Sequence, residues 1–274
     1  MPMVFTILGC GSSGGVPRVG QGWGACDPNN PKNRRRRCSL LVERIEKHGR
    51  TTVLVDTSPD LREQLLEAGV SKLDGVLFTH EHADHTHGID DLRPLALVQQ
   101  KRINVYLDAR TSDFLHMRFG YCFKTPVGSE YPPILTEHRI AAGQSVTIEG
   151  EGGTISALPF LQEHGSVQAL GFRFGGLAYS CDVSGFPAET TALHGLDVWI
   201  VDTLRYRPHP SHFTVEEALG WIEHMRPRRA ILTNLHTDLD YETLRASLPR
   251  SVEPAFDGMK IELNQQDSLG SEWV

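Results

Sequence analysis

The chain has 274 residues, of which 39% are hydrophobic and 22% charged, a composition that excludes a disordered or collagen-like protein. Its formal charge of −7 argues against a protein whose whole surface grips nucleic acid. Five scattered cysteines without a C-x-x-C pair are typical of a reduced, cytoplasmic protein, and no apolar run approaches the roughly 18 residues of a membrane span.

Short apolar runs rich in β-branched residues recur along the chain and predict strands. In chain order they cover residues 4–8, 52–55, 76–78, 155–158, 198–201 and 231–232. Helical periodicity that ends on a glycine predicts a helix over residues 60–69, and a capping threonine opens a second helix over residues 214–225. Strands and helices alternate, which indicates a layered α/β protein.

The segment of residues 140–180 has many glycines and short strand-like runs without long helices, and it predicts an antiparallel meander. No linker, low-complexity stretch or short repeat divides the chain. We therefore expect one domain over residues 1–263 and a dispensable polar tail over residues 264–274.

A cluster of histidines follows the apolar run that ends at Phe78. His80 and His82 leave an extended chain on the same side, because side chains alternate along a strand. A turn then directs Asp84 and His85 toward a second point. Imidazole and carboxylate ligands at two adjacent points suit a pair of zinc, manganese or iron ions.

The H-x-H-x-D-H motif after a strand resembles the signature of the metallo-β-lactamase superfamily. The glycine-rich segment 8–18, the sequence Pro-Lys-Asn-Arg-Arg at 31–35, Val55-Asp56 and Phe256-Asp-Gly-Met259 resemble one branch of it. That branch contains the PhnP-like cyclic-phosphate phosphodiesterases, which are related to the tRNA 3′-processing endonucleases. The resemblance implies a four-layer αββα sandwich with the metal site at one edge.

The resemblance also implies the remaining ligands of two divalent ions, zinc or manganese. His164 would complete the first ion, and Asp182 would bridge the two. Relatives often place the last histidine directly after Leu-Thr, where this chain has Asn234, but a shift of two residues along a strand preserves the side, so we expect His236 to serve. The predicted ligands are His80, His82 and His164 for one ion, Asp84, His85 and His236 for the other, and Asp182 between them.

His212, in the sequence His-Phe-Thr, resembles the H-x-T element with which phosphodiesterases of the superfamily hold or protonate the phosphate. We expect a hydroxide that bridges the metals to attack phosphorus, with His212 and Asp84 as the catalytic residues. The expected substrate is a small phosphodiester, of the cyclic ribose phosphate or nucleotide type.

Other readings stay open at this stage. A thioester hydrolase, a metal-based redox enzyme or an RNA-processing nuclease would use the same fold, and a non-catalytic binding protein could have inherited it. We expect neither a stable nucleic-acid complex nor a membrane partner, and the chain could form a homodimer.

Three further motifs have no assigned chemistry. Gly9-x-Gly11-x-x-Gly14 matches the dinucleotide fingerprint only in letters, because Pro17 and further glycines follow where a helix should begin, so we expect a turn. PhnP-like relatives carry a structural zinc on a cysteine cluster, but here Cys26 stands alone and we expect no such zinc. The arginine run 34–37 is either a solvated loop or, with Ser12 and Ser13, a phosphate-facing element near the cleft.

Overall fold

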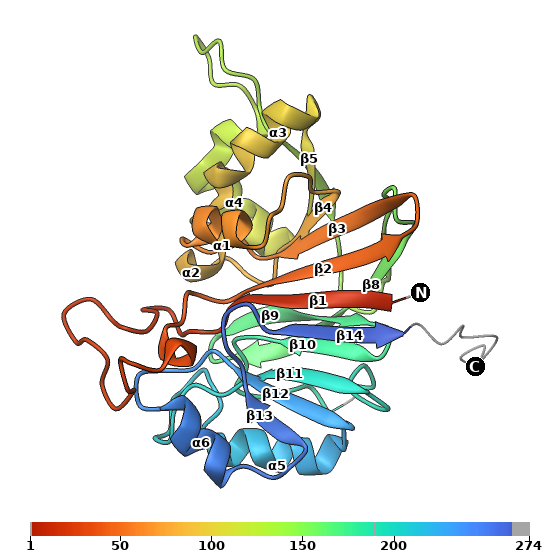
Figure 1. Cartoon of the computed structure of the whole chain (residues 1–274). Helices are drawn as coiled ribbons and strands as arrows, with labels where there is room; N and C mark the ends of the chain where they lie inside the picture. Colours follow the sequence, from red (N-terminus) through yellow and green to blue (C-terminus); the bar gives the residue numbers. More distant parts are fainter. Residues whose placement is uncertain (1, 189, 265–274) are drawn as a thin grey trace.

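The computed structural model describes residues 2–188 and 190–264, and the strands in these residues form two seven-stranded sheets (Figure 1). The first sheet has the order β14-β1-β2-β3-β4-β5-β6. Its strands are antiparallel from β14 to β3 and parallel from β3 to β6. They comprise β1 (Pro2–Gly9), β2 (Ser39–Glu46), β3 (Gly49–Val55), β4 (Gly75–Leu77), β5 (Ile103–Leu107), β6 (Leu135–Arg139) and β14 (Lys260–Asn264).

The second sheet has the order β13-β12-β11-β10-β9-β8-β7. It is antiparallel from β7 to β10, as the glycine-rich meander predicts, and parallel from β10 to β13. Its strands are β7 (Val146–Ile148), β8 (Ile155–His164), β9 (Val167–Phe174), β10 (Leu177–Ser180), β11 (Val198–Asp202), β12 (Arg229–Thr233) and β13 (Val252–Pro254).

Helices cover the outer face of each sheet (Figure 1). The first sheet carries α1 (Leu61–Glu67), α2 (Ala83–Thr86), the 3-10 turn η2 (Ile89–Leu92), α3 (Arg93–Gln99) and α4 (Ala109–Phe123), and the second carries α5 (Val215–Met225) and α6 (Tyr241–Ser247). The short 3-10 turn η1 (Pro31–Asn33) lies in the loop after β1. Three apolar clusters fill the layers: one between the sheets, one under α1 to α4 and one under α5 and α6. The predicted αββα sandwich is confirmed.

The predicted elements recur at nearly their expected bounds, and each strand run lies in one of the observed strands except that Phe78 follows the end of β4. Asn264, placed in the tail by the sequence, is the last residue of β14, and residues 265–274 lie outside the described part of the chain. Within the described residues, no helix is both long enough and apolar enough to span a membrane.

Arg34 is exposed, as expected of a solvated loop, but the other three residues of the arginine run have neither of the predicted settings. Arg36 pairs with Asp257 and Glu67, and Arg37 pairs with Asp60, so their charges are neutralised by the protein itself. Arg35 is only 2% exposed and donates to the side chain of Asn33 and to the carbonyl of His236. These arginines therefore join the segments of β1, α1 and β14 instead of facing a phosphate or open solvent.

Candidate metal centre

The loop after β4 supplies the first group of site residues. β4 is buried in the parallel part of the sheet, and the chain bends at Glu81 before His82, which has an extended backbone with φ −63° and ψ 152° and precedes the first turn of α2. The entry into α2 turns the chain, so that Asp84 and His85 follow on the helix. His80 and His85 are both at most 1% exposed, which holds two imidazoles beneath the surface at the edge of the first sheet.

The second sheet supplies the opposing group. His164 is the last residue of β8, and Asp182 follows the end of β10 in a left-handed backbone conformation with φ 56°. Aspartate adopts this left-handed conformation more readily than most residues. The conformation turns the side chain of Asp182 away from the direction of the strand and toward the first sheet. The site therefore lies between the two sheets, with ligands contributed by both.

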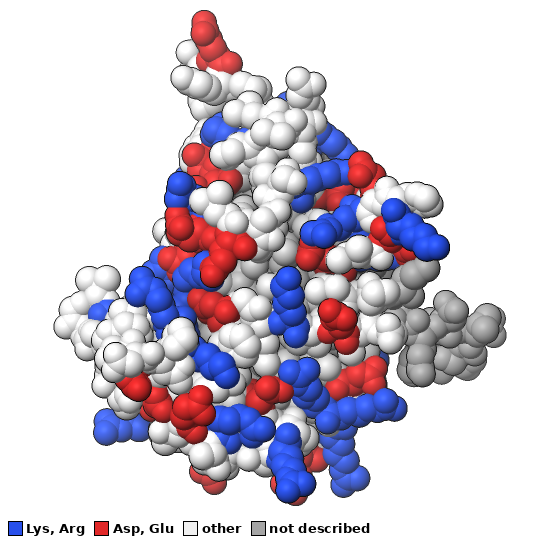
Figure 2. Space-filling model, viewed as in Figure 1, with Lys and Arg blue, Asp and Glu red and all other residues white. Residues whose placement is uncertain are grey.

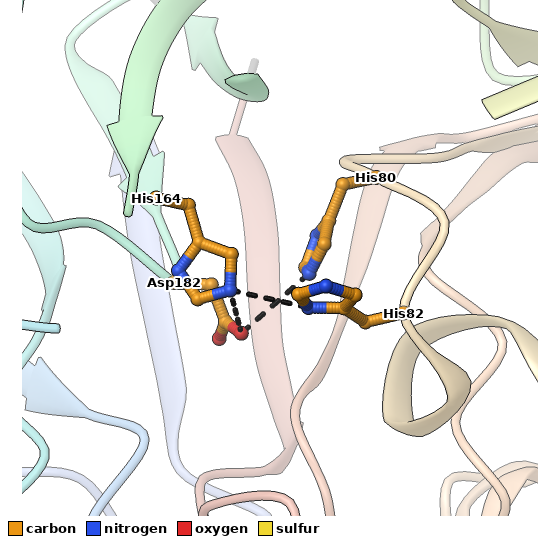
Figure 3. A group of neighbouring side chains, drawn as sticks. All are labelled: His80, His82, His164 and Asp182. Carbon is orange, nitrogen blue, oxygen red and sulfur yellow. Dashed lines mark hydrogen bonds and ion pairs between the residues drawn. The ribbon is translucent and has the colours of Figure 1, made fainter. Parts of the chain in front are cut away.

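Four side chains converge there (Figure 3). The potential ligand atoms of His80, His82, His164 and Asp182 all lie within 4.8 Å of one another. Nε2 of His164 is 3.1 Å from Nδ1 of His82, and Oδ2 of Asp182 is 3.6 Å from Nε2 of both His80 and His164. This spacing leaves a central point that each of the four groups can reach.

A second group shares Asp182. Its Oδ1 atom is 3.3 Å from Nε2 of His85, which is itself 3.5 Å from Oδ2 of Asp84. The thiol of Cys181 also lies within reach of His85 and Asp182. The two oxygens of Asp182 thus face two different groups of donors, as a bridging carboxylate would.

Hydrogen bonds behind the histidines fix which ring nitrogen faces the site. Asp56, which also has a left-handed φ of 64°, accepts from Nδ1 of His85 at 2.7 Å and from the hydroxyl of Thr79 at 2.7 Å. The Thr79 oxygen in turn accepts from Nδ1 of His80, at 2.9 Å. Such support is the usual way in which proteins orient metal-binding imidazoles.

His164 is oriented in the same way, because its Nδ1 lies 2.7 Å from the carbonyl oxygen of Ser211. A carbonyl only accepts, so Nδ1 carries the proton and Nε2 presents a lone pair to the site.

The buried charges at the site are strongly coupled. Burial lowers the pKa of His80 well below its usual value, and the nearby His85 adds to this effect. Burial also opposes the charge on His85, but the carboxylates of Asp182, Asp84 and Asp56 raise its pKa well above the usual value. Although burial works against its ionisation, His85 and His212 hold the pKa of Asp182 well below its usual range. The site therefore combines an ionised Asp182 with a neutral His80, the protonation state that a cation requires of its ligands, whereas His85 must give up a proton to bind a cation.

His212 lies beside this cluster, with its ring centroid 4.7 Å from that of His164. Its Nδ1 is 2.7 Å from Oδ2 of the fully buried Asp202. Burial opposes protonation, but Asp202 and Asp182 raise the pKa of His212 to about 9. The imidazole is consequently protonated at neutral pH and can donate from Nε2.

The donor set fits a divalent cation. Nε2 of His80 is buried and makes no hydrogen bond within the described residues, which is unusual for a polar atom in a protein interior. The lone pair of His164 also points at the cluster, and a cation would satisfy both atoms together with the Asp182 carboxylate. Of the seven predicted ligands the structure brings together His80, His82, Asp84, His85, His164 and Asp182.

His236 does not join this group. Its Nε2 atom lies 2.6 Å from Nη1 of Arg18, and because a guanidinium only donates, this nitrogen's lone pair is already used. The expectation assumed that a strand continues past Thr233, but β12 ends there and Asn234 has a left-handed φ of 61°. The alternation of side chains along the strand, which the prediction assumed, therefore stops at Asn234. The side chain of Asn234 reaches the site instead of that of His236, with Nδ2 3.0 Å from Oδ1 of Asp182.

Sequence reasoning assigned no role to three residues that support the site: Asp202, Asn234 and Thr79. Asp202 gives a signal in hindsight, because it is a carboxylate at the end of the buried run Val-Trp-Ile-Val. Asp56 follows β3 in the same manner, and its Val-Asp pair carried part of the family resemblance. An acidic residue directly after a fully buried strand is a sequence feature that could have identified both.

Known proteins resemble this chain over most of its length. Residues 51–234 match the family described as the β-lactamase superfamily domain. A solved diphosphatase of the PhnP family is 33% identical, with a TM-score of 0.84 over 96% of this chain and 98% of that chain. Zinc-bound PqqB from Methylobacterium extorquens is 18% identical with a TM-score of 0.72, over 95% of this chain and 100% of that chain. The short form of human tRNase Z is 18% identical with a TM-score of 0.62, over 94% of this chain and 98% of that chain.

A curated relative, named an octanoyltransferase, occurs in Porphyromonas gingivalis. It is 32% identical over 266 residues, which make up 95% of this chain and 51% of the relative. The chain thus spans about half the length of that relative.

Proposed function

This chain belongs to the metallo-β-lactamase superfamily of hydrolases, and on that premise we propose that it hydrolyses a small phosphodiester with two divalent metal ions, zinc or manganese. The observation that carries the proposal is the convergence of His80, His82, His164 and Asp182 within 4.8 Å, beside a protonated His212. The similarity to a PhnP-family diphosphatase supports phosphoryl chemistry in particular.

The residues divide into two positions for the ions. His80, His82 and His164 would hold the first ion, Asp84 and His85 would hold the second, and Asp182 would be shared by both. Bound divalent ions would lower the pKa of water to about 7, which supplies a nucleophile at neutral pH, and would offset the charge of the phosphate oxygens.

The protein itself supplies the acid. His212 donates the Nε2 proton to the departing oxygen, and Asp202 holds the imidazole by its Nδ1 in the orientation that this transfer needs. The raised pKa of His212, about 9, keeps the proton available at neutral pH.

We also propose that the substrate is a small molecule and not a long nucleic acid. Figure 2 shows acidic and basic side chains interspersed on one face, without a continuous basic field, and the formal charge of the chain is −7. A phosphate backbone is usually recognised by a basic stripe or patch. The five cysteines are free and buried, which supports a reducing compartment such as the cytoplasm.

A second candidate function is hydrolysis of an acyl ester or thioester. It is favoured by the octanoyltransferase that matches 95% of this chain, although that name describes a relative about twice as long. The same metal site would polarise an acyl carbonyl as well as a phosphoryl group.

One set of assays separates the two. The full chain, treated with chelator and reloaded with Zn²⁺ or Mn²⁺, is tested on bis(p-nitrophenyl) phosphate, cyclic ribose phosphates, cyclic nucleotides, p-nitrophenyl octanoate and an octanoyl thioester. We expect metal-dependent cleavage of a phosphodiester, lost in Asp182→Ala and kept in His116→Ala, which removes a half-exposed imidazole on α4. Cleavage of the acyl substrates alone would replace the proposal by the second candidate.

A further inference from the structure

The two oxygens of the Asp182 carboxylate have unequal surroundings. Oδ2 faces Nε2 of His80 and of His164 at 3.6 Å, and no hydrogen bond from the described residues reaches it. Oδ1 already accepts from the side-chain amide of Asn234 at 3.0 Å and from the thiol of Cys181 at 3.2 Å. A cation at the first position meets an unoccupied oxygen, whereas a cation at the second must compete with two protein donors.

Asn234 is built into this position by the backbone. It follows the last residue of β12 with a φ of 61°, a conformation that asparagine tolerates better than most residues. Its side chain is 2% exposed and lies between Asp182 and His212, with Nδ2 3.1 Å from Nδ1 of His212. The imidazole of His236, two residues on, is turned away to Arg18. His85 contacts Oδ1 of Asp182, whereas the contacts of His80 and His164 are to Oδ2.

The ligand chemistry of the two positions therefore differs. The first offers three imidazole nitrogens and one carboxylate oxygen, a set typical of zinc. The second offers one imidazole, from His85, and oxygens from Asp84 and Asp182, to which Asn234 can add an amide oxygen if its side chain turns over. The thiol of Cys181 also lies within reach of this position, but it donates its proton to Oδ1 of Asp182. Oxygen-rich sets favour manganese or magnesium and bind first-row metals less tightly than imidazole-rich sets.

We infer that the two metal positions are unequal, and that Asn234, standing where an imidazole would complete the second position, makes the ion there weak and exchangeable. The protein thus binds one ion tightly at His80, His82, His164 and Asp182. It binds a second ion more weakly beside His85. The inference rests on the proposed metal-dependent function, and it concerns binding alone, so it is tested without any substrate.

The test is a titration of the chelator-treated full chain with Mn²⁺ and with Zn²⁺, monitored by isothermal titration calorimetry. Electron paramagnetic resonance of the bound Mn²⁺ is a second readout. We expect two binding events in the wild type, with dissociation constants that differ at least about 10-fold, the lower end of what one change around a metal site brings. At one equivalent of Mn²⁺ the spectrum should show an isolated ion, without exchange coupling to a neighbour.

Two substitutions assign the difference to Asn234. Asn234→His should tighten the second ion by roughly 10- to 100-fold and give a coupled manganese pair at two equivalents. Asn234→Asp keeps the size and the tolerance for positive φ, so it should fold where the larger imidazole does not fit, and its carboxylate should also tighten the second ion. The matched control is His236→Asn, which removes an imidazole two residues away and should change neither affinity.

The outcomes are distinct. Two ions of equal affinity in the wild type, or loss of the second ion in His236→Asn, would overturn the inference and leave the proposed function in place. No ion bound to the wild type at all would refute both.

Discussion

His212 is the side chain whose role separates chemistry from metal binding. Its Nδ1 is held by Asp202 and its ring contacts that of His164, but it lies outside the group that can hold the first ion. His212→Ala should therefore keep the fold and the metal content while lowering kcat by roughly 10² to 10⁴, the range for one general acid. Elemental analysis and steady-state kinetics of the same preparation check both halves of this prediction.

The leaving group sharpens that experiment. Diesters of nitrophenol need little protonation, so the deficit of His212→Ala should shrink on them and appear in full on alkoxide leaving groups. His82→Ala is the comparison, because it removes a ligand and should lose metal together with rate. An equal deficit on both kinds of diester would leave His212 with phosphate positioning only, and metal loss in His212→Ala would make it a ligand.

For single residues, the sequence predicts those ligands whose side-chain direction is determined by regular secondary structure. His80, His82 and Asp182 follow strands, where alternation and strand ends limit the directions that a side chain can take. His236 follows a left-handed residue, and nothing in Leu-Thr-Asn-Leu-His reveals that the strand has already ended. The hydrogen bonds that Asp202 makes to His212 and Thr79 makes to His80 could not be predicted either, because no sequence motif links these pairs of residues.

Among the elements, α5 begins with a capping box directly after His212. The Thr214 hydroxyl accepts from the backbone of Glu217, and the Glu217 carboxylate accepts from the backbone of Thr214. Thr214→Ala should lower the free energy of unfolding by about 1 kcal/mol, within a range of roughly 0.5–2 kcal/mol for lost caps. Denaturant unfolding measures this loss, and Glu216→Gln, in the same turn but outside the cap, should change stability little. An unchanged midpoint in Thr214→Ala would show that tertiary packing alone fixes this helix start.

The first residue of α6 is preceded by Asp240, which gives a pH-dependent contribution to stability. Burial opposes its ionisation, but the backbone N–H groups of Thr243 and Asp27 and the amide of Asn33 together outweigh burial and lower the pKa of Asp240 to about 2. A lowered pKa stabilises the fold above the unfolded value of about 3.9, and this contribution is lost as the pH falls toward 2.

Asp240→Asn tests that contribution. The wild type should be more stable than this variant near neutral pH, and the gap should narrow between about pH 4 and pH 2 in urea titrations. A gap that stays constant over this interval would mean that the Asp240 charge contributes nothing.

Helices and strands were predictable where the hydrophobic periodicity agrees with the residues that begin or end an element. The predicted helix 214–225 matches α5 because threonine, glutamate and an apolar stripe all indicate it. The strands β2 and β14 and the helix α4 were not predicted. β2 begins with five buried residues, the last of which is the charged Glu43, and α4 contains Gly120 and a non-helical Phe119, so neither shows one clean period.

For the whole molecule, a bound metal would connect the two sheets. His80 and His82 follow β4 of the first sheet, and His164 and Asp182 come from the second sheet (Figure 3). Metal bound only by the folded state adds about 4 kcal/mol when its concentration is 1,000 times the dissociation constant. Chelation should therefore lower Tm by on the order of 10 °C for a chain of this size.

Differential scanning calorimetry with and without chelator measures this effect. Asp182→Ala, which cannot bridge the two positions, should show almost no response to the chelator. A wild-type Tm that does not depend on metal would mean that the sheets hold together without the metal.

The placement of the ligands on two sheets also orders events during synthesis. The ribosome releases His80, His82 and His85 about a hundred residues before Asp182, which is on the order of 5 to 20 s at usual translation rates. During that interval the nascent chain has part of a metal-binding group and no bridge. The complete group, with residues from both sheets, can form only after β10 has docked opposite the first sheet, so full binding of the cation would come late in folding.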